Sequence, residues 1–239
     1  MLRVLTRAAW LPAIVLAGLC VATPAQAQTP DAGPWQKEFA AFDAADKASP
    51  PAKGGIVFVG SSTIRLWDVK ASFPDLPVIN RGFGGSRLVD TLVNVDRLVL
   101  AYEPRTVVLY AGDNDIAAGV LTEQLAVDFE RFVRAVHTKL PQTRILYIAV
   151  KPSVLRWLNV DRMEMANDLI RAICSRDDRL GFLDLGPTML GWDERPRPEL
   201  FVSDGLHLSA LGYQVWTAVL RPLLAPPPTT TTAGVVTPR

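Results

Sequence analysis

Short, nearly continuous apolar segments that alternate with longer helical patterns constrain the fold of this chain more than any other feature. These segments are rich in β-branched and aromatic residues, which favours strands, and they lie at residues 56–59, 78–80, 106–110, 144–150 and 181–184. Strands that are apolar on both faces and alternate with helices are typical of a parallel sheet covered by helices on each side. The pattern therefore predicts a flavodoxin-like, three-layer α/β/α sandwich with about five parallel strands, in one domain over residues 28–224.

The intervening segments carry apolar residues at helical spacing. Helices are expected over residues 35–45, 88–99, 122–140, 162–175 and 209–223. Thr122 and Ser209 are the predicted N-caps of the third and the last of these. The predicted buried faces are Leu125, Phe129, Phe132, Val136 and Leu140 in the third helix, and Leu211, Val215, Val219 and Leu223 in the last.

The two ends of the chain are predicted to lie outside this domain. Residues 1–27 combine Arg3 and Arg7, an apolar run and a small-x-small cleavage site, which is the pattern of a secretory signal peptide. Its removal takes away two arginines and no acidic residue, so the formal net charge moves from +1 to −1. Residues 225–239 are rich in proline and threonine and are predicted to be a disordered tail. The protein is thus expected to be secreted or periplasmic.

Composition narrows the possible partners and the means of stabilisation. A nearly neutral chain without basic clusters gives no support for nucleic acid or an anionic membrane as a partner. The mature chain keeps one cysteine, Cys174, so it forms no internal disulfide. Cys174 falls among apolar residues at helical spacing and is expected in the core.

Ser61 and Ser62 follow the first predicted strand and Gly60, at the point where a helix would begin. Open α/β sheets place their chemistry at the carboxyl ends of strands, beside helix-start amides. A serine in this position also commonly caps a helix, and the stretch taken alone favours that role. Both interpretations stay open at this point.

Histidine is scarce in this chain, which has only His137 and His207. A serine nucleophile needs a base near neutral pH, and imidazole is the usual one. His137 follows Val136 of a predicted buried face, so it is expected to face solvent in a structural role. His207 stands ahead of the last helix, three residues after Asp204, and such a carboxylate is the third member of a Ser-His-Asp triad. Asp-x-x-His alone is a weak signal, and an aspartate that only caps nearby amides is the alternative.

Donors for an oxyanion would complete such a site. Gly84-Gly85 and residues 112–115 both follow predicted strands, so both are expected at the same sheet edge as the serines. Glycine lets a backbone N–H approach a substrate closely, and Asn114 offers a side-chain amide. Each loop by itself is equally consistent with an ordinary glycine turn.

Together, these stretches resemble the SGNH/GDSL hydrolase superfamily over nearly all of residues 54–224. The family's Gly-Asp-Ser block stands here as Gly60-Ser61-Ser62, with a serine in place of the aspartate, and this places the nucleophile on Ser62. The second block's oxyanion glycine corresponds to Gly85. Gly-x-Asn-Asp matches residues 112–115 and Asp-x-x-His matches residues 204–207, in the same order.

The resemblance implies acyl-ester hydrolysis through an acyl-enzyme, without metal or cofactor. Ser62 would attack, His207 would act as the base and Asp204 would orient it. The backbone N–H groups of Ser62 and Gly85, with the Asn114 amide, would hold the oxyanion.

The substrate is less constrained. Little chain remains for a lid, so an open, shallow site for a small-molecule or glycan ester with a short acyl group, such as acetyl, is expected. Arg65 and Trp157 are candidate substrate-binding residues, with Trp67, Arg87 and Arg156 as further wall candidates, although surface or packing roles are common for such residues. The leading prediction is a secreted serine esterase. A lysophospholipase or acyltransferase with the same triad, and a non-catalytic binding module that retains the fold, are the alternatives.

Overall fold

The computed structural model describes residues 33–225. The predicted signal peptide, residues 1–27, and residues 226–239 of the predicted tail lie outside the described residues. The chain divides into the units Met1–Gly33 and Pro34–Arg239, and the fold below belongs to the second.

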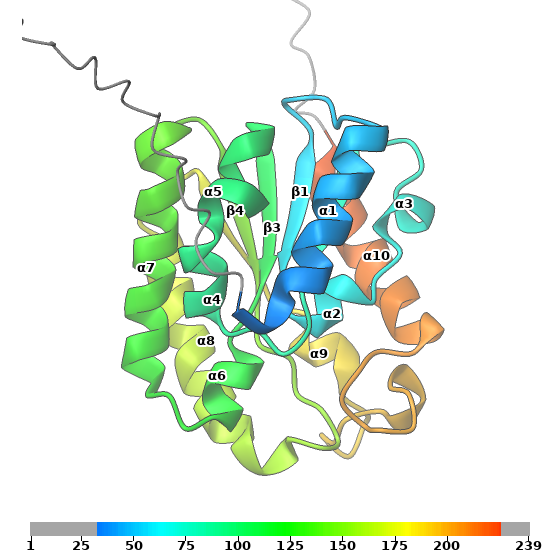
Figure 1. The fold of residues 1–239 in the computed structure, drawn as a ribbon. Helices are drawn as coiled ribbons and strands as arrows, with labels where there is room; N and C mark the ends of the chain where they lie inside the picture. The colour runs from blue at the N-terminus through cyan, green and yellow to red at the C-terminus, as the bar shows by residue number, and fades with distance from the viewer. Residues whose placement is uncertain (1–32, 226–239) are drawn as a thin grey trace, which may run out of the picture. The chain divides into compact units, whose positions relative to one another are not determined.

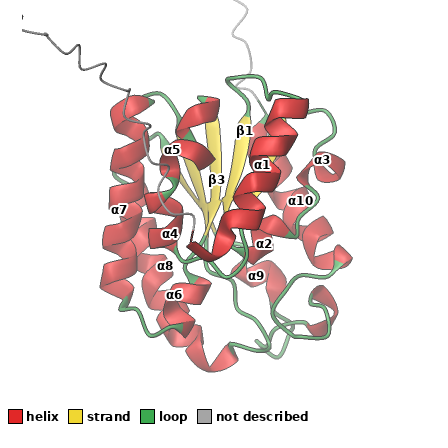
Figure 2. Ribbon diagram, viewed as in Figure 1, coloured by secondary structure: helices red, strands yellow, loops and turns green. Residues whose placement is uncertain are grey.

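Five parallel strands form one sheet in the order β2-β1-β3-β4-β5 (Figure 1). The strands are β1 (Ile56–Gly60), β2 (Val78–Gly82), β3 (Thr106–Tyr110), β4 (Arg144–Ile148) and β5 (Leu180–Leu183). Helices lie on both sides of the strands (Figure 2), which confirms the predicted three-layer α/β fold. Because all the strands are parallel, their carboxyl ends meet at one edge, and the chain reverses its strand order beside β1 there.

Helices precede the first strand, connect the strands and follow the last one. They are η1 (Gly33–Trp35), α1 (Gln36–Ala48), α2 (Ser62–Arg65), α3 (Val69–Ser72), α4 (Leu88–Val93), α5 (Val95–Leu98), η2 (Leu100–Tyr102), α6 (Asp113–Ala117), α7 (Thr122–Lys139), η3 (Trp157–Asn159), α8 (Val160–Cys174), α9 (Gly186–Met189), η4 (Pro198–Leu200) and α10 (Ala210–Leu224). No helix among residues 33–225 combines the length and the apolar character that crossing a bilayer requires.

In the last helix, α10, the buried residues each lie one position further along the sequence than the predicted ones. Ser209 is its N-cap as predicted, accepting a hydrogen bond from the Gly212 amide at 3.2 Å. The buried line, however, is Gly212, Trp216, Leu220 and Leu224. A Cβ on Gly212 would lie 2.4 Å from the Leu200 carbonyl oxygen, so only glycine allows this close approach. The approach turns the large Trp216 ring inward and leaves the predicted apolar residues at the margin of the core or exposed.

Two other helices also differ in detail from the prediction. Thr122 is the first residue of α7 and not its N-cap, because Leu121 holds that position without a side-chain hydrogen bond. The helix expected over residues 88–99 breaks at Asn94 into α4 and α5. The predicted buried residues of α7 are in the core up to Val136, and Cys174 is buried as predicted.

Candidate active site

The turn after β1 places two serines at the carboxyl edge of the sheet. Gly60 has φ +134, and a Cβ there would lie 1.9 Å from the Tyr110 carbonyl oxygen, so the neighbouring strand leaves room only for glycine. The Ser61 amide donates to the same carbonyl at 3.0 Å. Ser61 occupies the N-cap position of α2 without a side-chain capping bond, and Ser62 is the first residue of the helix. An amide at a helix start has no partner within the helix, so the Ser62 N–H is available to a ligand.

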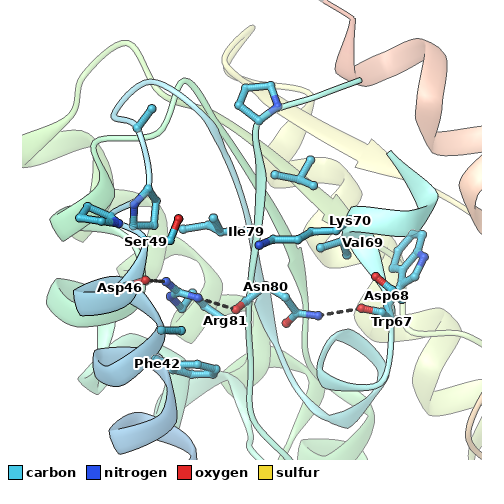
Figure 3. A pocket seen from close by; sticks show the side chains of 16 residues that line it. Phe42, Asp46, Ser49, Trp67, Asp68, Val69, Lys70, Ile79, Asn80 and Arg81 are labelled. Atoms are coloured by element: carbon cyan, nitrogen blue, oxygen red, sulfur yellow. Dashed lines mark hydrogen bonds and ion pairs between the residues drawn. The ribbon is translucent and has the colours of Figure 1, made fainter. Parts of the chain in front are cut away.

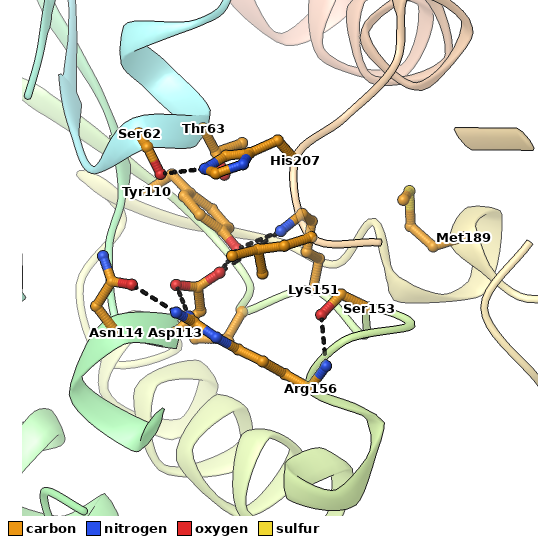
Figure 4. Close-up of polar contacts among 12 residues, drawn as sticks. Ser62, Thr63, Tyr110, Asp113, Asn114, Lys151, Ser153, Arg156, Met189 and His207 are labelled. Carbon is orange, nitrogen blue, oxygen red and sulfur yellow. Dashed lines mark hydrogen bonds and ion pairs between the residues drawn. The ribbon is translucent and has the colours of Figure 1, made fainter. Parts of the chain in front are cut away.

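Ser62, His207 and Asp204 form one hydrogen-bonded chain. The Ser62 Oγ lies 2.9 Å from the His207 Nε2 (Figure 4). On the other side of the ring, the His207 Nδ1 lies 2.6 Å from the Asp204 Oδ2. The structure therefore brings together the three residues that the sequence proposed as a triad, although they are up to 145 positions apart.

Asp204 has two functions in the backbone turn that it shares with His207. Its Oδ1 accepts the backbone N–H groups of Leu206 at 2.8 Å and His207 at 2.9 Å, so it does cap nearby amides, and its Oδ2 holds the imidazole. The hydrogen bond from His207, aided by these amides, lowers the pKa of Asp204 to about 2. The carboxylate is therefore ionised at neutral pH and fixes both the turn and the ring orientation.

The two loops proposed to supply oxyanion donors are tied to each other. The Asn114 Nδ2 donates to the Ser86 carbonyl at 2.9 Å. The carboxylate of Asp115 accepts the Leu88 amide at 3.1 and 3.2 Å. Burial raises the pKa of Asp115 to about 6. Gly85 directly precedes Ser86 in this loop, with φ +72 and open space where a Cβ would stand. The sequence did not reveal the linking role of Asp115.

A buried charged cluster, which sequence reasoning missed, lies next to Asn114. Asp113 accepts the Arg156 Nη1 on its Oδ1, while its Oδ2 lies 3.5 Å from the Lys151 Nζ and 3.2 Å from the Tyr110 hydroxyl. The Lys151 side chain is fully buried, and burial lowers its pKa against the opposing pull of Asp113. A lysine directly after the apolar run of β4 was the available sequence signal.

Neither candidate substrate-binding residue, Arg65 or Trp157, has a hydrogen bond to the proposed triad. Arg65 is exposed at the end of α2, and its side chain runs along Gly84. Trp157 is half-buried beneath the Arg195 guanidinium, which lies 5.0 Å from its ring centroid. It lines a concavity of about 780 Å³ that contains none of the three triad candidates.

The other wall candidates have structural contacts. Trp67 is 2% exposed and packs in the core against Trp216. Arg87 is the N-cap residue of α4, and its amide donates to the Asp90 carboxylate at 2.8 Å. His137 is half-buried, with its Nε2 2.9 Å from the Thr143 carbonyl oxygen, and so has a structural contact at the end of α7.

A further concavity of about 500 Å³ lies along the edge strand β2, between α1 and α3 (Figure 3). Two of its polar side chains already have partners, since Arg81 bonds Asp46 and the Asn80 Nδ2 donates to the Trp67 carbonyl at 2.9 Å. None of the triad candidates lines it. Within residues 33–225, no group of three or more His, Cys, Asp or Glu side chains is arranged to hold a metal ion.

The parallel sheet and the Ser-His-Asp arrangement at its carboxyl edge are those of an α/β hydrolytic enzyme. A sequence model of the GDSL-like lipase/acylhydrolase family matches residues 64–215, and the chain belongs to this family. The matched range begins just after Ser62. A search of curated proteins found no match.

Solved structures share the fold at low sequence identity. A protein from Streptococcus pneumonia named for platelet activating factor is 21% identical, with a TM-score of 0.71 over 80% of this chain and 92% of that one. A GDSL-like lipase from Bacteroides thetaiotaomicron is 17% identical, with a TM-score of 0.66 over 78% and 96%. A catalytic mutant of an acetylxylan esterase from Geobacillus stearothermophilus is 15% identical, with a TM-score of 0.57 over 71% and 94%.

Proposed function

We propose that this member of the family is an exported serine esterase that hydrolyses short-acyl carboxylic esters. The observation that carries the proposal is the continuous hydrogen-bonded chain from the Ser62 Oγ through His207 to the ionised Asp204. A serine that reaches an imidazole held by a carboxylate is the arrangement of an activated nucleophile. Export rests on the signal-peptide pattern of residues 1–27, and N-terminal sequencing of the exported protein tests it.

In the proposed reaction, the His207 Nε2 takes the hydroxyl proton as the Ser62 Oγ attacks the ester carbonyl carbon. The tetrahedral intermediate collapses, its bond to the alkoxide breaks, and the imidazolium returns the proton to the leaving alcohol. His207 then takes a proton from a water as the water oxygen attacks the acyl carbon. The second tetrahedral intermediate breaks its bond to the Ser62 Oγ, the imidazolium returns the proton to that oxygen, and the acid leaves. In both halves the negative oxygen is held by the Ser62 and Gly85 amides and the Asn114 side chain.

The oxyanion role of Asn114 is tested by Asn114→Ala. We expect kcat to fall on the order of 10²–10³, because one preorganised donor to the intermediate is lost. Asn94→Ala is a matched control, since it removes a side-chain amide that bonds the Asp90 carbonyl between α4 and α5. Steady-state kinetics of both variants on one ester decide the matter. Equal rates for the two variants would remove Asn114 from the oxyanion site.

The short-acyl preference rests on the expectation that little chain remains for a lid once the sheet and the helices are counted. Acetyl esters of glycans fall within this class, and the similar fold of an acetylxylan esterase supports them as candidates. In a series of aryl esters from acetyl to octanoyl, we expect no rise in kcat/KM with chain length, because a shallow site gains nothing from a longer chain that it cannot bury. A rise toward octanoyl would contradict the proposal and favour a lysophospholipase-type activity.

A further inference from the structure

Asn114 has to present its nitrogen, and not its oxygen, to a developing oxyanion. A carboxamide is nearly symmetrical in shape, so the neighbours of the side chain decide which way it points. Here each of the two neighbours can act in only one way, as a donor or as an acceptor. The Asn114 Oδ1 accepts the Arg156 Nη2 at 2.9 Å, and arginine can only donate. The Nδ2 donates to the Ser86 carbonyl at 2.9 Å, and a carbonyl can only accept. One hydrogen of the Nδ2 remains for a substrate.

Arg156 is itself held in place from the opposite side. Its Nη1 pairs with the Asp113 Oδ1, and its side chain is only 17% exposed. The second oxygen of Asp113 is held by the Tyr110 hydroxyl at 3.2 Å and faces the Lys151 Nζ at 3.5 Å, both on buried side chains (Figure 4). The guanidinium thus spans the anchored Asp113 and the Asn114 amide with two nitrogens, which is a task for a planar fork.

We propose that Arg156 is a positioning residue for the oxyanion site, acting through Asn114 by fixing the orientation of its amide. The inference rests on the proposed function. Asp113, which Tyr110 and Lys151 hold in turn, fixes the guanidinium, so that the Asn114 donor is in place before the ester binds. Preorganisation of this kind raises kcat, since the donor meets the oxygen only when charge develops on it.

The test is a double-mutant cycle of Arg156→Met and Asn114→Ala, measured as kcat and KM on acetyl esters. For Arg156→Met alone we expect kcat to fall about 10- to 100-fold with KM little changed. This fall in kcat is smaller than the one expected when a whole oxyanion donor is removed. In the Asn114→Ala background the same change should cost less than about twofold, because residues that act through one contact are not additive. An equal cost in both backgrounds would overturn the inference.

Two further variants keep this result interpretable. Arg162→Met is the matched control, because Arg162 donates to the Ile116 and Val120 carbonyls at the end of α6 without contacting Asn114, and kcat should hold. Arg156→Met leaves Asp113 with Lys151 and Tyr110, so folding is expected. Should the variant unfold, Arg156→Lys replaces it in the cycle, since lysine keeps the charge but lacks the fork.

Failure of the inference is distinguishable from failure of the proposed function. Ser62→Ala is measured in the same assay. If Ser62→Ala keeps full turnover, the serine esterase proposal fails. If Ser62→Ala is inactive and Asn114→Ala is slow, but Arg156→Met costs the same factor in both backgrounds, only the positioning role of Arg156 is lost.

Discussion

Ser62→Ala is expected to lower kcat on the order of 10⁶, which corresponds to about 8 kcal/mol of transition-state stabilisation. The reason is that the acyl-enzyme cannot form without the Oγ that the His207 Nε2 approaches at 2.9 Å. Ser62 is the half-buried first residue of α2, where alanine is well tolerated, so the thermal midpoint should stay close to that of the parent. Steady-state kinetics, with circular dichroism to verify folding, measure the effect.

Ser61→Ala is the matched control for this variant. Ser61 is the neighbouring serine, and its backbone alone supplies the helix-start hydrogen bonds. Its variant should retain the parent kcat within a few-fold. An inactive Ser61→Ala beside an active Ser62→Ala would shift the nucleophile by one residue and contradict the proposed triad.

His207→Ala is expected to cost about as much as Ser62→Ala, on the order of 10⁶ in kcat, because the triad members act as one unit. The same reasoning predicts that the double variant is no slower than either single one. Without the imidazole, the Ser62 hydroxyl keeps its proton and the leaving alkoxide has no acid. Kinetics of the two single variants and the double variant test this directly.

His137→Ala controls for the loss of a histidine as such. His137 bonds the Thr143 carbonyl beside the end of α7, and among residues 33–225 it is the other histidine. We expect its kcat to match the parent, with at most a modest loss of stability from the missing hydrogen bond. Multiplicative losses in Ser62→Ala/His207→Ala would show that the two residues do not act together.

The sheet could be predicted from the sequence because each strand is a local pattern. The pairing of Ser62 with His207 could be predicted because their short motifs together resemble those of the SGNH/GDSL superfamily. Apolar runs such as residues 106–110 are recognisable without their neighbours, and they form β3 over the same range. The carboxyl ends of parallel strands must meet at one edge, so the loops carrying Ser62 and Asn114 were expected to converge. A chain with two histidines left few choices for a base.

Local sequence patterns could not predict features that depend on contacts between elements distant in the sequence. The buried face of α10 follows from the close approach of Gly212 to the Leu200 carbonyl, and helical periodicity cannot reveal that contact. The cluster around Asp113 needs β3 and β4 to be neighbours, because Asp113 follows the first and Lys151 the second. Arg156 was considered only as a wall residue, whereas its partners Asp113 and Asn114 lie 42 to 43 positions away.

The proposed role of Ser62 as an activated nucleophile is tested most directly by the intact mass of the protein after incubation with an alkyl fluorophosphonate, followed by peptide mapping. In this reaction an activated serine oxygen displaces fluoride from phosphorus. We expect one adduct per chain, on Ser62, that is lost in His207→Ala and retained in His137→Ala. A folded protein that stays unlabelled, or one labelled on Ser61, would contradict this role, and an unlabelled protein would point instead to a binding module that retains the fold.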